Sequence, residues 1–435
     1  MAVKDISKKS LVQLVHTCYV GLRTKRDCED VDNLQGNFFT ASLVSGENMK
    51  HYIIPIFIPH MGCPHQCVFC NQHKITGVDT TVTPAEIKEK IAAHTDAITR
   101  PYYVEAAFYG GSFTALTLER QRELLAPAAD FLQRGKIHGI RLSTRPDCIT
   151  EKNLLLLQEM GVKTIELGAQ SFADKVLQKA ERGHLAEDTF QAAALIKKAG
   201  FKLGVQLMPG LPGENEESLQ LMLESTLQIK PDLVRIYPTL VLKGTKLAEM
   251  YAAGEYQPLS LEQAIDTAAR LKLAFEENGI RVIRTGLQSS EELDNPENVK
   301  GGPYDPAFGE MAENRIFLWQ IQYLLQKLGA STGECVIYHA PCDTSKVRGV
   351  KKRNLIKLQE LYPQLEFHFT AAGRKGEITV EYNGEEDVSP LVRREAGPLQ
   401  QRQPEVLLPL AKHEERGYKK KQARLSRHGL YEILF

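Results

Sequence analysis

The sequence predicts an α/β protein whose larger part is a partial (β/α)6 TIM barrel, followed by a small C-terminal α/β appendage. Between residues 50 and 290, short apolar strand candidates alternate with longer amphipathic segments, and the connections are short. Such alternation is typical of parallel β/α architecture. A content of 43% hydrophobic and 25% charged residues is that of a globular protein. A doubly wound sheet would show the same alternation, so the pattern leaves both architectures open.

The elements of this region can be predicted in order. The expected strands are Ile53–Ile58, Val104–Tyr109, Ile140–Ser143, Thr164–Leu167, Lys202–Leu207 and Leu233–Tyr237. The expected helices are Pro84–His94, Leu118–Gln133, Glu151–Met160, Ala186–Ala199, Glu216–Gln228 and Leu261–Asn278. Thr83 and Glu86 predict a capping box at the first helix. Gly161 and Gly200 stand where two of the helices are expected to end.

The chain divides into four parts by composition. Residues 1–48 are polar without a sustained period, and Met49 stands just before the first strand, so we expect an N-terminal extension or a start assigned too early. The barrel should span 49–290 and the appendage 291–389. Residues 390–435 are rich in glutamine, proline and basic residues, which predicts a weakly structured tail.

Charge and hydropathy restrict the function classes. The 54 basic and 54 acidic residues balance, so a dominant nucleic-acid surface is not predicted. The basic runs Lys351–Arg353 and Lys419–Lys421 are expected to be solvated. No run approaches the ~18 apolar residues of a membrane helix, and no signal-peptide core is present. We therefore expect a cytoplasmic protein without a membrane partner.

The strongest motif is the C-x3-C-x2-C loop of Cys63, Cys67 and Cys70, directly after the first strand. Loops at the carboxyl ends of barrel strands carry active sites. Three soft, anionic thiolates suit an iron–sulfur cluster and leave one iron open to another molecule. Reduced, unliganded thiols are one alternative. A structural zinc site is another, and its fourth ligand would be a nearby histidine: His60, His65 or His73.

This loop, with an aromatic residue before its last cysteine, resembles the radical S-adenosylmethionine (SAM) superfamily. Residues 51–290, more than half of the chain, resemble the radical SAM half of the Elongator catalytic subunit and its bacterial relatives. The matching stretches are Leu142–Asp147, Ile165–Ser171, Arg182–His184, Met208–Gly213 and Ile236–Leu240. The resemblance implies a partial barrel of the radical SAM type, a 4Fe–4S cluster on the three cysteines, and SAM. A weaker likeness is to the oxygen-independent coproporphyrinogen oxidases.

The resemblance also implies roles at the ends of the strands. Gly110, Gly111 and Ser112 should bind the SAM amino group. Gln170 and Arg182 should touch SAM. The remaining cofactor candidates are Phe69, whose ring offers an apolar face to the adenine, Ser143 and Gln206 near the ribose, and Glu166. An arginine suits the SAM carboxylate because guanidinium and carboxylate match in bidentate geometry. Taken alone, each candidate could be a structural polar residue, and Glu166 could form a buried salt bridge.

Several other residues are weaker candidates. Tyr237, Tyr304 and His339 could face substrate or simply pack. Cys335, His339 and Cys342 could form a second metal site. Cys335 is typical of an ordinary strand cysteine, which favours packing.

The resemblance implies an enzyme that works with a one-electron reductant of the flavodoxin or ferredoxin type. SAM would be cleaved to a 5′-deoxyadenosyl radical, which takes a hydrogen atom from a substrate. A tRNA base is one candidate substrate, and a small molecule or tetrapyrrole is the second. A non-catalytic iron–sulfur or haem-binding protein is the third hypothesis. Two departures from the Elongator subunit stand out: its spacing before the second cysteine is longer, and residues 291–435 here lack a Q/R-x-x-G-x-G/A loop for coenzyme A.

Overall fold

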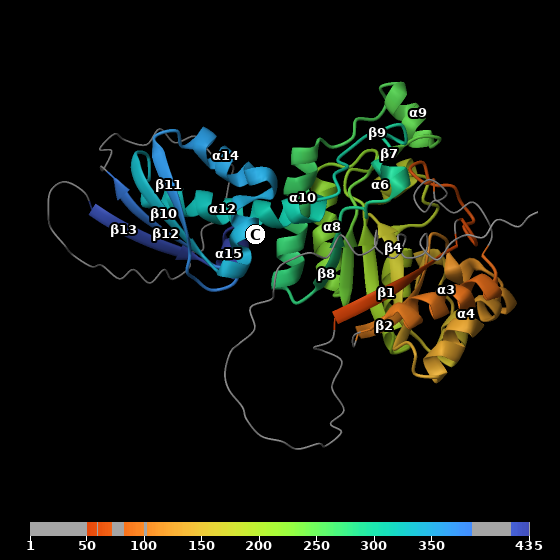
Figure 1. Cartoon of the computed structure of the whole chain (residues 1–435). Helices are drawn as coiled ribbons and strands as arrows, with labels where there is room; N and C mark the ends of the chain where they lie inside the picture. Colours follow the sequence, from red (N-terminus) through yellow and green to blue (C-terminus); the bar gives the residue numbers. More distant parts are fainter. Residues whose placement is uncertain (1–49, 59, 72–81, 100–101, 385–418, 435) are drawn as a thin grey trace, which may run out of the picture.

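The computed structural model describes residues 50–58, 60–71, 82–99, 102–384 and 419–434. Within these residues, the larger sheet has seven parallel strands that form a curled half-barrel (Figure 1). A second sheet of four strands belongs to the C-terminal part of the chain. The expected extension over 1–48 lies outside the described residues, as does His73.

The strands of the half-barrel follow one another in chain order. They are β1 (Lys50–Phe57), β2 (Tyr102–Tyr109), β3 (Gly139–Thr144), β4 (Val162–Gln170), β5 (Lys202–Leu207), β6 (Leu233–Ile236) and β8 (Arg281–Thr285). Every neighbouring pair is parallel. A doubly wound sheet would reverse its order at a switch point, so the sequential order confirms the partial barrel.

The six predicted strands are confirmed to within three residues at each end, and β8 is an addition. Its five residues include two arginines, Arg281 and Arg284, around a short apolar pair, so β8 has no clear apolar run. Pairing with β6 defines this strand.

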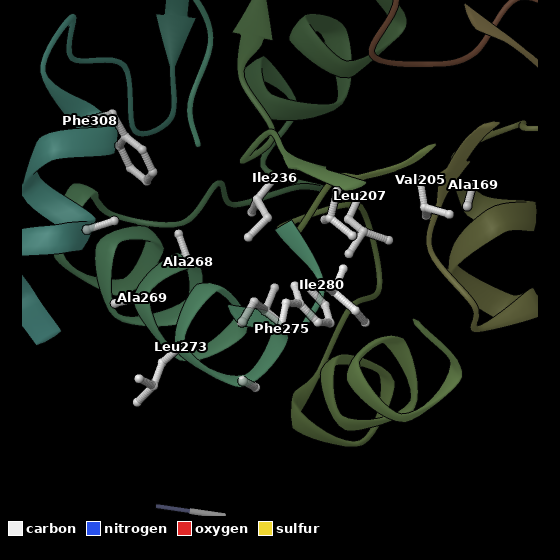
Figure 2. Packing of buried hydrophobic residues seen from close by; sticks show 14 of the residues in the cluster. Ala169, Val205, Leu207, Ile236, Ala268, Ala269, Leu273, Phe275, Ile280 and Phe308 are labelled. Atoms are coloured by element: carbon white, nitrogen blue, oxygen red, sulfur yellow. The ribbon is translucent and has the colours of Figure 1, made fainter. Parts of the chain in front are cut away.

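Helices cover the outer face of the half-barrel (Figure 1). They are α3 (Pro84–Ala97), α4 (Leu118–Gln133), α5 (Glu151–Glu159), α7 (Ala186–Lys198), α8 (Glu216–Ile229) and α10 (Leu261–Glu277). Two shorter helices, α6 (Asp174–Lys179) and α9 (Lys246–Ala252), lie at the end of the strands and pack beside the cysteine loop. The capping box of Thr83 and Glu86 is present at α3. Alternate strand residues point outward to these helices. Figure 2 shows part of this layer, with Ile236 of β6 and Phe275 of α10 in the same apolar cluster.

The C-terminal part is built around one long helix, α12 (Phe308–Leu328), which packs on α10 and on the second sheet. That sheet has the order β11-β10-β12-β13. Its strands are β10 (Gly333–His339), β11 (Leu365–Ala371), β12 (Ile378–Gly384) and β13 (Lys419–Leu425), and the helices are α13 (Thr344–Arg348), α14 (Arg353–Leu361) and α15 (Arg427–Leu434).

Residues 419–434 differ from the expected tail. They form β13 and α15, and β13 pairs antiparallel with β12. Alternation of Ala423 and Leu425 with polar neighbours allows one face of β13 to be buried. Because basic residues surround these two apolar side chains, the sequence pattern did not predict this strand.

Several short elements complete the part of the chain that the structure describes. They are β7 (Val241–Leu242), β9 (Val299–Gly301), α11 (Glu291–Asp294) and four 3₁₀ turns at Phe113–Ala115, Pro146–Cys148, Pro341–Asp343 and Val350–Lys352. In the part of the chain that the structure describes, no helix is long and apolar enough to cross a membrane.

Candidate active site

The three motif cysteines lie in the loop after β1, at the carboxyl end of the barrel strands. Cys67 is buried, Cys63 and Cys70 are half-buried, and none of the three is in a disulfide. The loop folds back on itself, since the Cys63 N–H donates to the His60 carbonyl and the Cys70 N–H to the Cys67 carbonyl. Three thiols are thus presented by one short, folded segment.

The glycine–serine turn after β2 packs directly on this loop. The Ser112 N–H donates to the Met61 carbonyl at 2.9 Å, and the Ser112 hydroxyl lies 3.3 Å from the Cys63 sulfur. Gly62 has φ +74°, and a Cβ there would lie 2.4 Å from the Ser112 carbonyl oxygen. A Cβ on Gly111 would lie 2.5 Å from the Met61 carbonyl oxygen. Both glycines therefore allow the two loops to touch.

Arg182 contacts the middle cysteine of the loop. Its Nη1 donates to the Cys67 sulfur at 3.2 Å, and its Nη2 donates to the Gly168 carbonyl at 2.6 Å. The side chain is buried. Position along the chain predicted that Arg182 returns to the cysteine loop. The proposed contact with the SAM carboxylate stays a prediction.

An apolar cluster holds the other side of the loop. Its buried members are Val68, Val176, Ala180, Leu211, Val241, Leu247 and Tyr256. The Val68 N–H donates to the Ala180 carbonyl, and the Val68 carbonyl accepts from the Leu247 N–H. Phe69 packs against this cluster, so part of its ring is used for structure. Its role toward adenine stays a prediction.

Charged side chains pair inside the half-barrel, on the face opposite the helices. Arg141 lies 2.9 Å from Glu105 and 3.2 Å from Glu166, and Arg235 lies 2.5 Å from Glu166. Two carboxylates thus balance two guanidiniums. Glu166 forms the buried salt bridges that the sequence allowed as its alternative role, and a direct contact with SAM stays a prediction.

Two tyrosines extend this network toward the carboxyl end of the strands. Arg235 donates to the Tyr109 hydroxyl at 2.5 Å and to the Tyr237 hydroxyl at 2.9 Å. Burial and the charge of Glu166 raise the pKa of Tyr109 well above its usual range, so its phenol is protonated. The half-buried Tyr109 directly precedes the glycine–serine turn. Tyr237, an open candidate in the sequence, therefore lies in the barrel interior.

The glutamine candidates lie together. Gln206 on β5 donates from Nε2 to the Gln170 Oε1 at 3.1 Å. Gln170 ends β4 in the left-handed region, with φ +67°, and its carbonyl accepts from the Met208 N–H. Ser143, on β3, is half-buried and opposite Glu166 in the strand register. All three positions are at or near the carboxyl ends of neighbouring strands.

Three further residues at this edge were not candidates in the sequence. Arg145 is buried and pairs with Asp147 at 2.8 Å. Burial, with Arg182 and Arg145 nearby, lowers the pKa of His184 to about 3, so its ring is neutral. The only signal for these residues was their place in stretches that resemble the Elongator subunit.

The weaker candidates of the C-terminal part have packing roles. Cys335 is fully buried on β10, and burial raises the pKa of its thiol to about 12. His339 donates from Nδ1 to the Ala340 carbonyl. Tyr304 donates to Asp294 and packs in a small apolar cluster. These contacts favour the packing interpretation over a second metal site.

Comparisons with known proteins agree with this geometry. Residues 57–225 match the Radical SAM superfamily, and residues 231–317 match the Radical_SAM C-terminal domain. A tRNA uridine(34) acetyltransferase of Methanocaldococcus jannaschii is 33% identical over 189 residues, which are 39% of this chain and 35% of that protein. An uncharacterised protein of the same archaeon is 32% identical over 230 residues, covering 50% of this chain and 69% of that protein. The chain therefore spans only about a third of the acetyltransferase.

One solved structure is similar in fold and sequence. The archaeal Elp3 of Methanocaldococcus infernus, with an N-terminal deletion, superposes with a TM-score of 0.50 at 25% identity, covering 65% of this chain and 64% of that one. The chain belongs to the radical SAM superfamily, whose members are enzymes that use a 4Fe–4S cluster and SAM. Three cysteines in one loop, with Ser112 beside Cys63 and Arg182 beside Cys67, suit the thiolate ligands of such a cluster.

Proposed function

We propose that this chain binds a 4Fe–4S cluster through Cys63, Cys67 and Cys70, cleaves SAM reductively, and uses the resulting radical on a tRNA base. The observation that carries the proposal is the folded loop that presents three cysteines at the mouth of the half-barrel. A one-electron reductant of the flavodoxin or ferredoxin type would supply the electron. We expect the reaction in the cytoplasm.

The chain's own residues would bind and orient SAM, and they would exclude water from the site. The bound cluster and SAM supply electron transfer and a 5′-deoxyadenosyl radical. Gly110, Gly111 and Ser112 would hold the SAM amino group through their backbone, and the Gln170–Gln206 pair would face the ribose side. The apolar cluster around Val68 shields one side of the loop from water.

The charge balance of the interior favours a nucleobase over a tetrapyrrole. The arginines on the inner face, Arg141 and Arg235, each pair with Glu105 or Glu166. A tetrapyrrole carries several carboxylates, which would need unpaired cations when they leave water. A neutral base needs hydrogen bonds and flat apolar surface, and the ring of Tyr237 would offer such a surface. The names of the similar acetyltransferases point to the same substrate class.

We do not extend acetyl transfer to this chain. Residues 291–435 lack the loop that would bind the coenzyme A pyrophosphate. The described part of this segment is instead a small α/β unit around α12.

Reconstituted protein tests the proposal. With SAM and dithionite under anaerobic conditions, the parent should release 5′-deoxyadenosine, and bulk tRNA from a deletion strain should increase the release. Nucleoside digests of that tRNA should show a new mass by liquid chromatography–mass spectrometry. The control is the triple variant C63A/C67A/C70A, which should lack the brown cluster.

Each result separates the hypotheses. No 5′-deoxyadenosine above the triple variant would favour a non-catalytic protein. Release that tRNA does not stimulate, with unchanged nucleosides, would favour a small-molecule substrate. A full cluster in the triple variant would contradict the ligand assignment.

A further inference from the structure

Arg182 is a buried cation without a carboxylate partner. Its side chain is 6% exposed, and among the described ion pairs none includes it. The two nearest carboxylates in sequence are engaged elsewhere, since Glu181 pairs with Lys246 and Asp188 accepts from the Leu185 N–H. A buried charge is costly unless an opposite charge compensates it.

The polar partners of Arg182 are a carbonyl and a sulfur. Nη2 donates to the Gly168 carbonyl at 2.6 Å, and Nη1 donates to the Cys67 sulfur at 3.2 Å. A carbonyl carries no net charge. Of these two partners, only the Cys67 sulfur, as a thiolate ligand, can carry a negative charge beside this guanidinium.

The fold is built to place the guanidinium there. Gly168 leaves room for it, because a Cβ would lie 3.3 Å from Nη2. Gly183, with φ +72°, admits the His65 ring, whose Cδ2 would lie 2.4 Å from a Cβ. Gly183 thus lets the cysteine loop pack against the turn that carries Arg182.

Cys63 differs from Cys67 in its polar neighbour. Cys63 faces the neutral hydroxyl of Ser112 at 3.3 Å. Arg145 is near enough to interact with Cys67, but Asp147 neutralises it at 2.8 Å. The positive charge of Arg182 therefore acts at Cys67 and not at Cys63.

We propose that Arg182 raises the reduction potential of the cluster by donating a charge-assisted hydrogen bond to its ligand Cys67. The inference rests on the cluster ligation proposed above, and not on the substrate. When the cluster takes one electron from the reductant, its negative charge grows and spreads over the thiolates. A donor on one of those sulfurs stabilises the reduced form more than the oxidised form. In this role Arg182 is a positioning residue that acts on the cluster through Cys67.

The test is an EPR-monitored redox titration of reconstituted protein without SAM. R182M removes both charge and donor, R182Q keeps a neutral donor, and R182K keeps the charge without the planar fork. We expect the midpoint potential of the cluster to be highest in the parent and to decrease from R182K to R182Q to R182M. A tenfold loss of preference for the reduced cluster in R182M corresponds to about 59 mV for one electron. R122M, at an exposed arginine of α4, is the control and should match the parent.

Iron content and circular dichroism are measured on every variant. An unchanged midpoint in variants that hold four irons would overturn the proposal, and weaker SAM binding in the same variants would instead establish the carboxylate clamp. If R182M loses iron, the midpoint potentials of R182Q and R182K test the proposal in its place. Loss of iron from all three folded variants would also overturn the tuning role, because Arg182 would then be needed for ligation itself. Failure of the proposed ligation would be a separate result, in which the parent holds no more cluster than the triple cysteine variant.

Discussion

Glu166 accepts hydrogen bonds from two buried guanidiniums and one phenol. Oε1 accepts from Arg141, Arg235 and Tyr109, each at 3.2 Å, and Oε2 accepts from Arg235 at 2.5 Å. The carboxylate is 3% exposed. One side chain therefore compensates two positive charges, from β3 and β6, inside the half-barrel.

Glu166→Gln should destabilise the fold strongly. An amide cannot compensate Arg141 and Arg235, and breaking a buried pair costs about 3–5 kcal/mol. Urea unfolding monitored by circular dichroism measures the loss. Glu123→Gln is the control, because its pair with Arg120 is exposed and should be worth about 0–1 kcal/mol. Equal unfolding free energies of the two variants would mean that the network contributes no stability.

At the scale of elements, the cysteine loop depends on its contact with the turn after β2. Gly62→Ala should shift the loop, because its Cβ would meet the Ser112 carbonyl oxygen at 2.4 Å. An alanine held at the positive φ of Gly62 also has about 1–2 kcal/mol of backbone strain. We expect fewer than four irons per chain by colorimetric assay.

Gly135→Ala is the matched control for this variant. Gly135 also has a positive φ, +66°, but a Cβ there meets nothing within 4 Å. It should lose similar backbone stability and keep its iron. If both variants kept a full cluster, the packing of the two loops would not be required for ligation.

The loop between β5 and α8 contains a buried acid. Glu214 accepts from the Gly210 N–H at 2.5 Å, and its other oxygen is buried without a partner in the described structure. Burial raises the pKa of Glu214 from 4.5 to about 8. The unfolded chain ionises this carboxyl at lower pH than the folded chain. Its contribution to stability is therefore present at low pH and is lost as the pH rises toward 8.

Glu214→Gln should remove this pH dependence. Its melting temperature should equal that of the parent near pH 4.5 and exceed it increasingly up to pH 8. The difference in unfolding free energy between the variant and the parent grows by at most about 1.4 kcal/mol per pH unit. Differential scanning fluorimetry across this range measures it. A difference that shrinks with rising pH would contradict the assigned direction.

For the whole molecule, α12 and α15 join the half-barrel to the second sheet. Arg427 of α15 lies 2.9 Å from Glu313 on α12 and 2.9 Å from Glu276 on α10. Lys272 and Lys346 also lie near Glu313, and these cations lower the pKa of its carboxyl. Charge therefore connects the C-terminal helix to both parts of the molecule.

Arg427→Met should loosen α15 without unfolding the barrel. We expect hydrogen–deuterium exchange over Arg427–Leu434 to accelerate on the order of tenfold, with β4 and β5 unchanged. Arg424→Met is the control, because that side chain is 58% exposed in its pair with Glu377. Equal exchange in both variants would show that apolar contacts alone hold α15.

Much of the barrel could be predicted because its signals are local. The alternation of strands and helices requires only neighbouring residues, and so do the capping box of Thr83 and the spacing of Cys63, Cys67 and Cys70. The same locality explains why β8 and β13 were missed. Their short, arginine- and lysine-rich segments become strands because a neighbouring strand pairs with them.

By itself the sequence determined the class of fold and the loop of three thiols, since both follow from short-range patterns. Tertiary structure decided which charges meet. Arg182 reaches Cys67 across 115 positions of chain, and Arg235 reaches Glu166 across 69. Such pairs depend on the curvature of the sheet and on glycines such as Gly168 that leave room for them. No periodicity encodes these distances, so the partners of each buried charge emerge only when the half-barrel closes around them.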